Sequence, residues 1–335
     1  MKWLSVAVLL AGSFACLPNV SLGLDRVSEN VSALRPKRMI GGSVTAPFPW
    51  HAMVYLSENI LDGGFAGGAL IAERWILTAG RNLFVRKSRN DTRGKEPLIP
   101  KVYLGISYRS DARASTEVAV EKVFLHPGFQ NTSDWDNDLA LIKLKEPVNF
   151  SESIMPIPLP GVGDNQEEKK GERGIIAGWG WGRLFTTAPI LKFLALPIVP
   201  CQGEYQAKVL ASTPNVTDTQ FCTGPSKYQE NVCFGDAGGA LAFLNANTNE
   251  VYAAGVLSFD KACSVEDHAV YIKISAYLPW IHSVMRGDSH EFAARRTSFF
   301  NRMFPDILPL VDSKGAVHDE LLYTILQSQK YQDMK

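Results

Sequence analysis

The chain of 335 residues has no excess of either charge and, beyond its first residues, no long apolar stretch. Lysine and arginine total 34, and so do aspartate and glutamate, so the formal net charge is zero. A neutral chain has no net field that would favour nucleic acid or an anionic membrane. No later run reaches the roughly 18 apolar residues that a membrane-spanning helix needs. We therefore expect no nucleic-acid partner and no membrane insertion.

The amino terminus has the pattern of a secretory signal. Lys2 precedes the apolar run from Trp3 to Ala15, and small residues follow it. Cleavage after Ala15 and cleavage after Gly23 both fit the sequence. We therefore expect a signal peptide over about residues 1–23 and a secreted, extracellular protein.

Cysteine is scarce, with 5 in the whole chain. The four cysteines after Cys16 form an even set that suits two disulfides in an oxidising compartment. Asn-x-Ser/Thr sequons in polar, turn-like stretches agree with secretion and predict a glycoprotein. The sequons begin at Asn90, Asn131, Asn149 and Asn215.

A short polar segment, residues 24–38, separates the signal from the main body and ends in basic residues at Arg38. Such a stretch can be a solvated basic turn. Because the sequence Met-Ile-Gly-Gly follows at once from Met39, we instead expect a propeptide that a basic-specific convertase removes by cutting between Arg38 and Met39.

From residue 39 to about residue 286 the chain reads as an all-β domain. Apolar residues alternate with others in short runs between clusters of Gly, Pro, Asn and Asp, and no helical patterns intervene as a parallel sheet would require. This arrangement favours an antiparallel barrel. One helix at about Tyr277 to Met285 is expected to close the domain. The clearest alternations are Val102, Leu104, Ile106 and Val270, Ile272, Ile274.

The carboxy-terminal tail, residues 287–335, differs in composition from the domain before it. A basic and aromatic linker leads to an amphipathic helix, with Asp319 and Glu320 at its start and Lys330 near its end. The pattern favours a helix on the domain's own surface over a tail that binds a partner.

Five motifs occur in the order and rough spacing of trypsin-like serine proteases, and the resemblance covers about residues 39 to 286. Five motifs in order are much more specific than any one of them. The resemblance implies a chymotrypsin-like double antiparallel β-barrel with a C-terminal helix. The motifs begin at Met39 (Met-Ile-Gly-Gly), Trp75 (Trp-Ile-Leu-Thr-Ala), Asp138 (Asp-Leu-Ala-Leu-Ile), Gly178 (Gly-Trp-Gly) and Gly235 (Gly-Asp-Ala-Gly-Gly).

The same resemblance implies that the catalytic triad is degenerate. Arg81 stands where the family has its histidine base, and arginine stays protonated and cannot accept a proton. Ala237 stands at the nucleophilic serine, and a methyl group cannot attack a carbonyl carbon. Asp138 matches the orienting aspartate but has no imidazole to orient. We therefore expect a serine protease homologue that is not an enzyme and has no cofactor or metal.

The substrate cleft departs from the family template as well. Phe259 and Asp260 follow Ser258 where the family has tryptophan and glycine, and the Asp260 side chain would project towards the path of a bound peptide. Asn231 replaces the acid that trypsin uses for basic side chains, and Ala269 replaces a pocket-lining glycine. Together these changes imply that peptide binding in the cleft is not retained.

Part of the activation apparatus is implied to survive. After cleavage the new α-amino group of Met39 would pair with Asp236, because a buried carboxylate without a partner is strongly unfavourable. Asn82 replaces the cysteine expected beside the catalytic histidine, so that bridge is absent. The disulfides that the template implies are Cys201–Cys222 and Cys233–Cys263.

Several stretches resemble one degenerate branch, the haptoglobin family, which also has alanine for the serine, a basic residue for the histidine and asparagine for the adjacent cysteine. Three shared degeneracies are more specific than a shared fold. The resemblance implies an acute-phase plasma glycoprotein that captures free haemoglobin and so limits oxidative damage and iron loss. Phe259 can instead simply fill the vacated cleft. The candidate contacts with haemoglobin are Lys227, Tyr228, Phe259 and Lys261.

Departures from the mammalian members change the expected partners. Only a short propeptide precedes Met39, and Pro158 occupies the position of the cysteine that tethers the mammalian amino-terminal module, so dimerisation through that module is not expected. The segment from Cys201 to Cys222 lacks the lysine-rich loop that mammalian members use for the macrophage scavenger receptor, so binding to that receptor is not expected either. These differences suggest a non-mammalian, fish-like member.

A protease homologue can also act as a regulatory cofactor, an antimicrobial protein or a heparin-binding protein. A basic loop would support this alternative, although it also reads as a solvated loop near the Asn90 sequon. Salt-dependent retention on heparin would favour the alternative, whereas salt-insensitive binding to haemoglobin would favour haptoglobin-like capture. The loop contains Arg86, Lys87, Arg89, Arg93 and Lys95.

Overall fold

The fold is that of a computed structural model, and every described residue belongs to the second of two units into which the chain divides, residues 1–35 and 36–335. The expected signal peptide and propeptide, and the tail beyond Gly287, lie outside the described residues. The structure describes residues 42–44, 48–56, 64–83, 98–129, 136–161, 171–182, 186–201, 217–245, 250–259 and 268–287.

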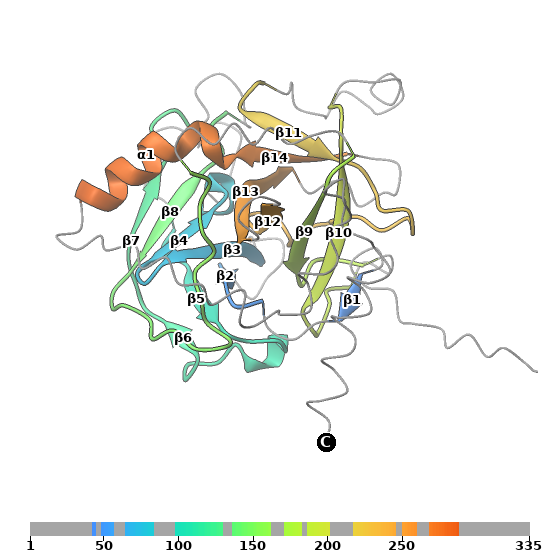
Figure 1. Cartoon of the computed structure of the whole chain (residues 1–335). Helices are drawn as coiled ribbons and strands as arrows, with labels where there is room; N and C mark the ends of the chain where they lie inside the picture. Colours follow the sequence, from blue (N-terminus) through green and yellow to red (C-terminus); the bar gives the residue numbers. More distant parts are fainter. Residues whose placement is uncertain are drawn as a thin grey trace, which may run out of the picture. The chain divides into compact units, whose positions relative to one another are not determined.

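The first sheet is a curled antiparallel sheet of seven strands in the order β6-β5-β2-β3-β4-β8-β7 (Figure 1). Strands β3 and β4 pack closely at Gly68 because this residue has no side chain. A Cβ at Gly68 would lie 2.9 Å from the Ile76 side chain on β4. The strands are β2 (His51–Tyr55), β3 (Phe65–Ala72), β4 (Trp75–Thr78), β5 (Lys101–Leu104), β6 (Glu117–Val118), β7 (Val120–Leu125) and β8 (Ala140–Leu144).

The second sheet closes into a barrel. Strand β10 pairs with both β9 and β11, so the order β10-β11-β14-β13-β12-β9 returns to its start, and β1 adds to the outer side of β10. The expected all-β double antiparallel barrel is thereby confirmed. The strands are β1 (Ser43–Val44), β9 (Arg173–Gly178), β10 (Lys192–Val199), β11 (Gln220–Thr223), β12 (Ala240–Asn245), β13 (Glu250–Phe259) and β14 (Ala269–Lys273).

Helix α1 (Ile274–Gly287) follows β14 directly and packs against β13 (Figure 1), and its Tyr277 and Trp280 rings meet the ring of His126, which follows β7. It is longer at both ends than the predicted helix, and Ile274, which the alternation assigned to a strand, is its first residue. The reason is burial: Ile274, Tyr277 and Ile281 all reach the core of the first barrel, which a continued strand could not achieve. Short 3-10 turns occur at η2 (Gly80–Leu83) and η3 (Arg109–Asp111).

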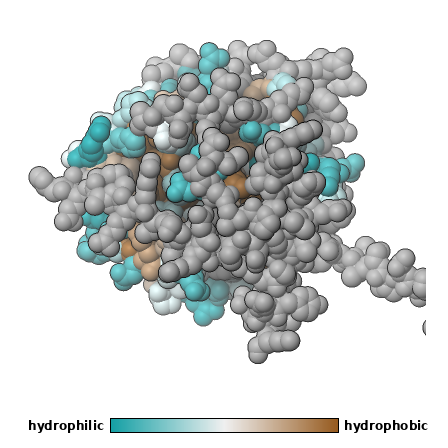
Figure 2. Space-filling view, in the orientation of Figure 1, coloured by the Kyte–Doolittle hydropathy of each residue, from teal (hydrophilic) through white to brown (hydrophobic). Residues whose placement is uncertain are grey.

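A buried cluster joins the two barrels. Met53 and Tyr103 come from the first sheet, and Trp179 and Phe193 come from the second barrel. Tyr103 is therefore buried although it alternates with the inward-facing Val102, because the second barrel covers the other face of β5. On the face shown in Figure 2 hydrophilic residues lie around the margin, and hydrophobic residues appear between them over the sheets.

Candidate functional site at the degenerate triad

Arg81 and Asp138 lie at the ends of two paired strands and share one polar network. Arg81 lies in η2 after β4, and Asp138 precedes β8, which pairs with β4. The fully buried Asp138 carboxylate accepts the backbone N–H of Arg81 at Oδ1 (2.7 Å) and the hydroxyl of Ser258 at Oδ2 (2.7 Å). The Arg81 Nε lies 3.5 Å from the same Oδ2. A guanidinium group therefore compensates the charge of this buried carboxylate.

Ala237 is buried, and its carbonyl group ties the nucleophile loop to the first sheet. Its carbonyl oxygen accepts the backbone N–H of Gly67 on β3 (2.8 Å) and the side-chain amide of Asn82 in η2 (2.9 Å). Sequence reasoning missed this role of Asn82, which it treated only as a lost cysteine. The available signal was the side-chain amide of asparagine, whose two N–H donors can bind a backbone carbonyl group.

The backbone of the nucleophile loop has a shape that glycine permits. Gly238 has a φ of 90°, and a Cβ there would lie 2.2 Å from the Gly67 carbonyl oxygen. The Asp236 carboxylate is fully buried and accepts the N–H groups of Gly180 (2.8 Å) and Cys233 (3.0 Å). Its expected partner, the α-amino group of Met39, lies outside the described residues, as does Arg38.

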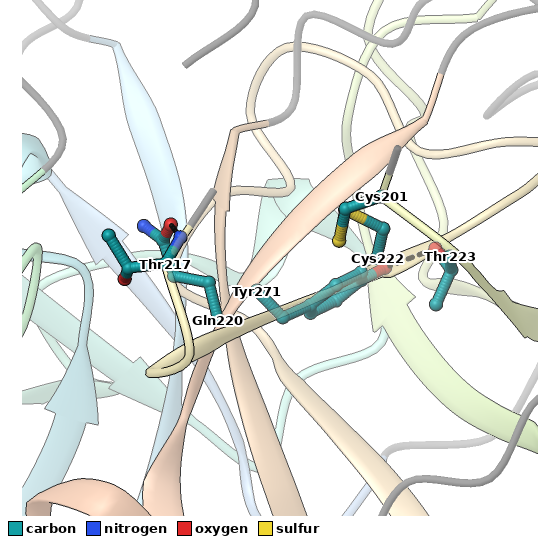
Figure 3. Close-up of a disulfide and its surroundings, with 6 residues drawn as sticks. All are labelled: Cys201, Thr217, Gln220, Cys222, Thr223 and Tyr271. Carbon is teal, nitrogen blue, oxygen red and sulfur yellow. Dashed lines mark hydrogen bonds between the residues drawn. A yellow bond between two sulfur atoms is a disulfide. The ribbon is translucent and has the colours of Figure 1, made fainter. Parts of the chain in front are cut away.

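The two predicted specificity-pocket positions, Asn231 and Ala269, are both fully buried. Asn231 is fully buried, and its Oδ1 accepts the N–H of Val232 at 2.9 Å. Tyr271 on β14 stacks on Phe221 with ring centroids 5.3 Å apart, and its hydroxyl accepts a hydrogen bond from Thr223 at 3.2 Å (Figure 3). Burial raises the pKa of the Tyr271 hydroxyl, so it stays neutral.

Phe259 is 6% exposed and packs against Cys222 and Val270. This position favours the packing role of Phe259 over direct contact with a partner. A disulfide joins Cys201 to Cys222 with Cα atoms 5.2 Å apart (Figure 3). Cys233 is also disulfide-bonded, whereas Cys263, Asp260 and Lys261 lie outside the described residues.

The loop from Ser226 to Glu230 is held in one shape by its own side chains. The Ser226 hydroxyl accepts the N–H groups of Tyr228 (3.2 Å) and Glu230 (3.3 Å) and donates to Glu230 Oε2 (3.1 Å). Glu230 Oε1 accepts the N–H of Gly42, which anchors the loop beside β1 at 2.8 Å. At the tip, Tyr228 is 47% exposed and the Lys227 ammonium lies 5.1 Å from its ring centre.

The remaining predicted sites are mostly outside the described part of the chain. Asn149 lies exposed after β8, whereas the other sequons and the basic loop of residues 86–95 are not described. Among the described residues no group of three His, Cys, Asp or Glu side chains is placed to hold a metal ion. Within the same ranges no helix is long and apolar enough to cross a membrane.

Two antiparallel barrels with this polar network between them define a trypsin-like protein, and residues 40–281 match the Trypsin family. Haptoglobin of Canis lupus familiaris is 34% identical over 269 residues, covering 75% of this chain and 75% of the relative. Haptoglobin of Oryctolagus cuniculus is 34% identical over 264 residues (74% and 70%), and human haptoglobin is 33% identical over 264 residues (74% and 60%). The chain belongs to the haptoglobin family, a branch of the trypsin-like proteins.

Proposed function

We propose that this chain is a secreted, non-enzymatic plasma protein that captures free haemoglobin and so limits oxidative damage and iron loss. The observation that carries the proposal is the Arg81–Asp138 pair beside Ala237, in a chain similar to haptoglobins. The network holds its carboxylate with an arginine and presents a methyl group where a nucleophile would stand. What remains is a rigid pair of barrels whose loops can bind a partner.

The absence of catalysis follows from two independent defects. Ala237 provides no lone pair for attack, and a guanidinium already paired with Asp138 cannot take a proton. Either defect alone removes the acyl-transfer mechanism. A chain with both defects can therefore act by binding a partner but not by acyl transfer.

The loop from Ser226 to Glu230 fits the role of a haemoglobin contact. Its internal hydrogen bonds fix the backbone before binding, which lowers the entropy lost on association. Tyr228 offers a large, half-exposed ring with few rotatable bonds, and Lys227 places a positive charge over it. Lys261 remains a further candidate contact. Because Phe259 is buried, its substitution would act mainly on folding stability.

Surface plasmon resonance with immobilised oxygenated haemoglobin tests this function. The glycosylated wild type is expected to bind in a manner insensitive to salt, and Tyr228→Ala is expected to weaken binding by about 2 kcal/mol, the scale of an interface hot spot. Leu98→Ala removes a comparably exposed apolar side chain (46%) from another loop and serves as the control. Undetectable binding by the wild type at micromolar concentration would contradict the function.

Processing between Arg38 and Met39 belongs to the same proposal. The buried Asp236 carboxylate accepts two backbone N–H groups, and a cationic α-amino group would compensate its charge. Amino-terminal sequencing of secreted protein is expected to begin at Met39. Secreted material that begins before Met39 would count against the cut. The exposed Asn149 is a proposed glycan site, together with Asn90, Asn131 and Asn215.

A further inference from the structure

A second surface, which we name the aromatic–arginine surface, lies beside the nucleophile loop and consists of Phe65, Tyr108, Arg109, Trp181 and Phe234. Two of its members expose large apolar rings: Tyr108 is 53% exposed and Phe234 is 41% exposed. The other three are half-buried. Tyr, Trp and Arg are the residues that most often carry the energy of protein interfaces.

The surface is continuous, because a chain of contacts links its members. The backbone N–H of Trp181 donates to the backbone carbonyl of Phe234 at 2.8 Å. The two rings meet edge to face with centroids 6.0 Å apart. Trp181 forms a β-bridge with Thr187, whose hydroxyl accepts a hydrogen bond from the Arg109 guanidinium.

Phe65 closes this circuit at the nucleophile loop. The Arg109 guanidinium lies over the Phe65 ring, 5.2 Å from its centre. A Cβ at Gly235, the residue after Phe234, would lie 3.2 Å from the same ring. Tyr108 precedes η3 and forms a β-bridge with Ile190, and the backbone N–H of Arg109 donates to the Pro189 carbonyl. These contacts hold both residues against the segment that leads into β10. The surface therefore spans elements of both barrels in one fixed arrangement.

The environment of Arg109 indicates the kind of group that a partner would place against it. Its side chain is fixed by the Phe65 ring and Thr187, yet across the described ranges no carboxylate lies within salt-bridge distance of it. Its neighbour Arg113, by contrast, lies 3.8 Å from Asp111. A guanidinium held in place without an acidic partner suits a bidentate contact with an incoming carboxylate. One arginine on a neutral chain does not suit the repeated phosphates of a nucleic acid.

We propose that the aromatic–arginine surface is a docking site for the protein that this chain captures, and that Arg109 binds an aspartate or glutamate flanked by apolar side chains on that protein. The inference rests on the proposed capture of haemoglobin and locates a second contact area, separate from the Ser226–Glu230 loop. Phe234 and Tyr108 provide the apolar contact, and Arg109 fixes the orientation of the partner.

The test measures haemoglobin binding by surface plasmon resonance for four variants at three positions and for two matched controls. Phe234→Ala is expected to weaken binding about thirty-fold, which corresponds to a hot spot of about 2 kcal/mol. Tyr108→Ala and Arg109→Gln are each expected to weaken it about tenfold. Arg109→Lys should restore only part of the affinity, because lysine cannot make the bidentate contact.

The controls match the variants in kind. Phe150 is as exposed as Phe234 (41%), and Phe150→Ala leaves the Asn149 sequon intact. Arg286→Gln removes an exposed arginine from the last turn of α1. Both controls should bind like wild type, and urea unfolding midpoints of all variants should show that each is folded. Radical footprinting should show Trp181 and Phe234 protected in the complex.

The outcomes separate the two proposals. Wild-type affinity in Phe234→Ala, Tyr108→Ala and Arg109→Gln, with Trp181 and Phe234 still labelled in the complex, would overturn this docking site while leaving haemoglobin capture intact. Weakened binding by the control variants to the same degree would also overturn it, because the effect would then not be local. No binding by the wild type would overturn both the docking site and the capture on which it rests.

Discussion

At the scale of single residues, the region around Arg81 and Asp138 shows how a buried charge is stabilised. A buried carboxylate needs hydrogen bonds and a compensating charge, and Asp138 receives both from its contacts with Arg81 and Ser258. Arg81 therefore stabilises the buried carboxylate of Asp138, which gives both residues a structural role.

Restoring the nucleophile alone should not restore activity. Ala237→Ser would supply a hydroxyl, but Arg81, at the predicted position of the base, is paired with Asp138 and cannot accept its proton. Processed Ala237→Ser is expected to show no turnover of fluorogenic peptides and no labelling by a fluorophosphonate probe. Labelling of the wild type or of this variant at any residue of the cleft would show that the site still activates a nucleophile.

Removing the carboxylate tests its structural role. Asp138→Ala leaves the Arg81 charge without its partner and the Ser258 hydroxyl without its acceptor, and we expect a loss of about 3 kcal/mol in the free energy of unfolding. Arg81→Gln should also lower the free energy of unfolding, because the fully buried Asp138 carboxylate would lose the charge of this arginine. Urea unfolding of both variants and of the double variant measures the coupling between them. Additive effects would show that the pair does not interact.

At the scale of elements, Glu230 determines how the loop with Tyr228 is presented. Its carboxylate accepts hydrogen bonds from Gly42, the residue before β1, and from the Ser226 hydroxyl within the loop. Glu230→Ala should remove both hydrogen bonds. We expect hydrogen exchange of the amides at residues 226–230 to accelerate about tenfold, which corresponds to a loss of about 1.4 kcal/mol in local opening. Glu250→Ala, at the exposed start of β13, is the control. Unchanged exchange would mean that the backbone bonds and the Ser226 hydroxyl hold the loop without the Glu230 carboxylate.

The elements themselves were predictable from the sequence to different degrees. Alternation and turn residues predicted an antiparallel all-β domain, and the motif order predicted its two barrels. Alternation failed at Tyr103, which is buried by a second barrel that a local pattern cannot reveal, and at Ile274, where α1 begins. The contacts of Arg109 with Phe65 and Thr187 were equally invisible, because they join segments far apart in the sequence.

At the scale of the whole molecule, the two barrels are tied by contacts that should make them unfold together. The Ala237 carbonyl binds donors from the first sheet, and the cluster around Met53 and Trp179 fills the space between the barrels. His51 lies beside this cluster, with its ring 5.1 Å from that of Trp179. Among the described residues its Nε2 has no hydrogen-bond partner. Burial lowers the pKa of His51 to about 3.

This histidine should make the folded protein sensitive to acid. The unfolded chain takes up a proton on His51 below about pH 6.5, whereas the folded protein does not until about pH 3, so stability falls as the pH drops through this window. One such group contributes a loss of about 2 kcal/mol between pH 6.5 and 5. Burial also lowers the pKa values of His126 and His282, which add to the loss in the same direction. Urea midpoints measured at pH 7.5, 6 and 5 should therefore fall for the wild type and fall less for His51→Phe, and equal slopes for the two proteins would show that His51 is protonated in the folded state.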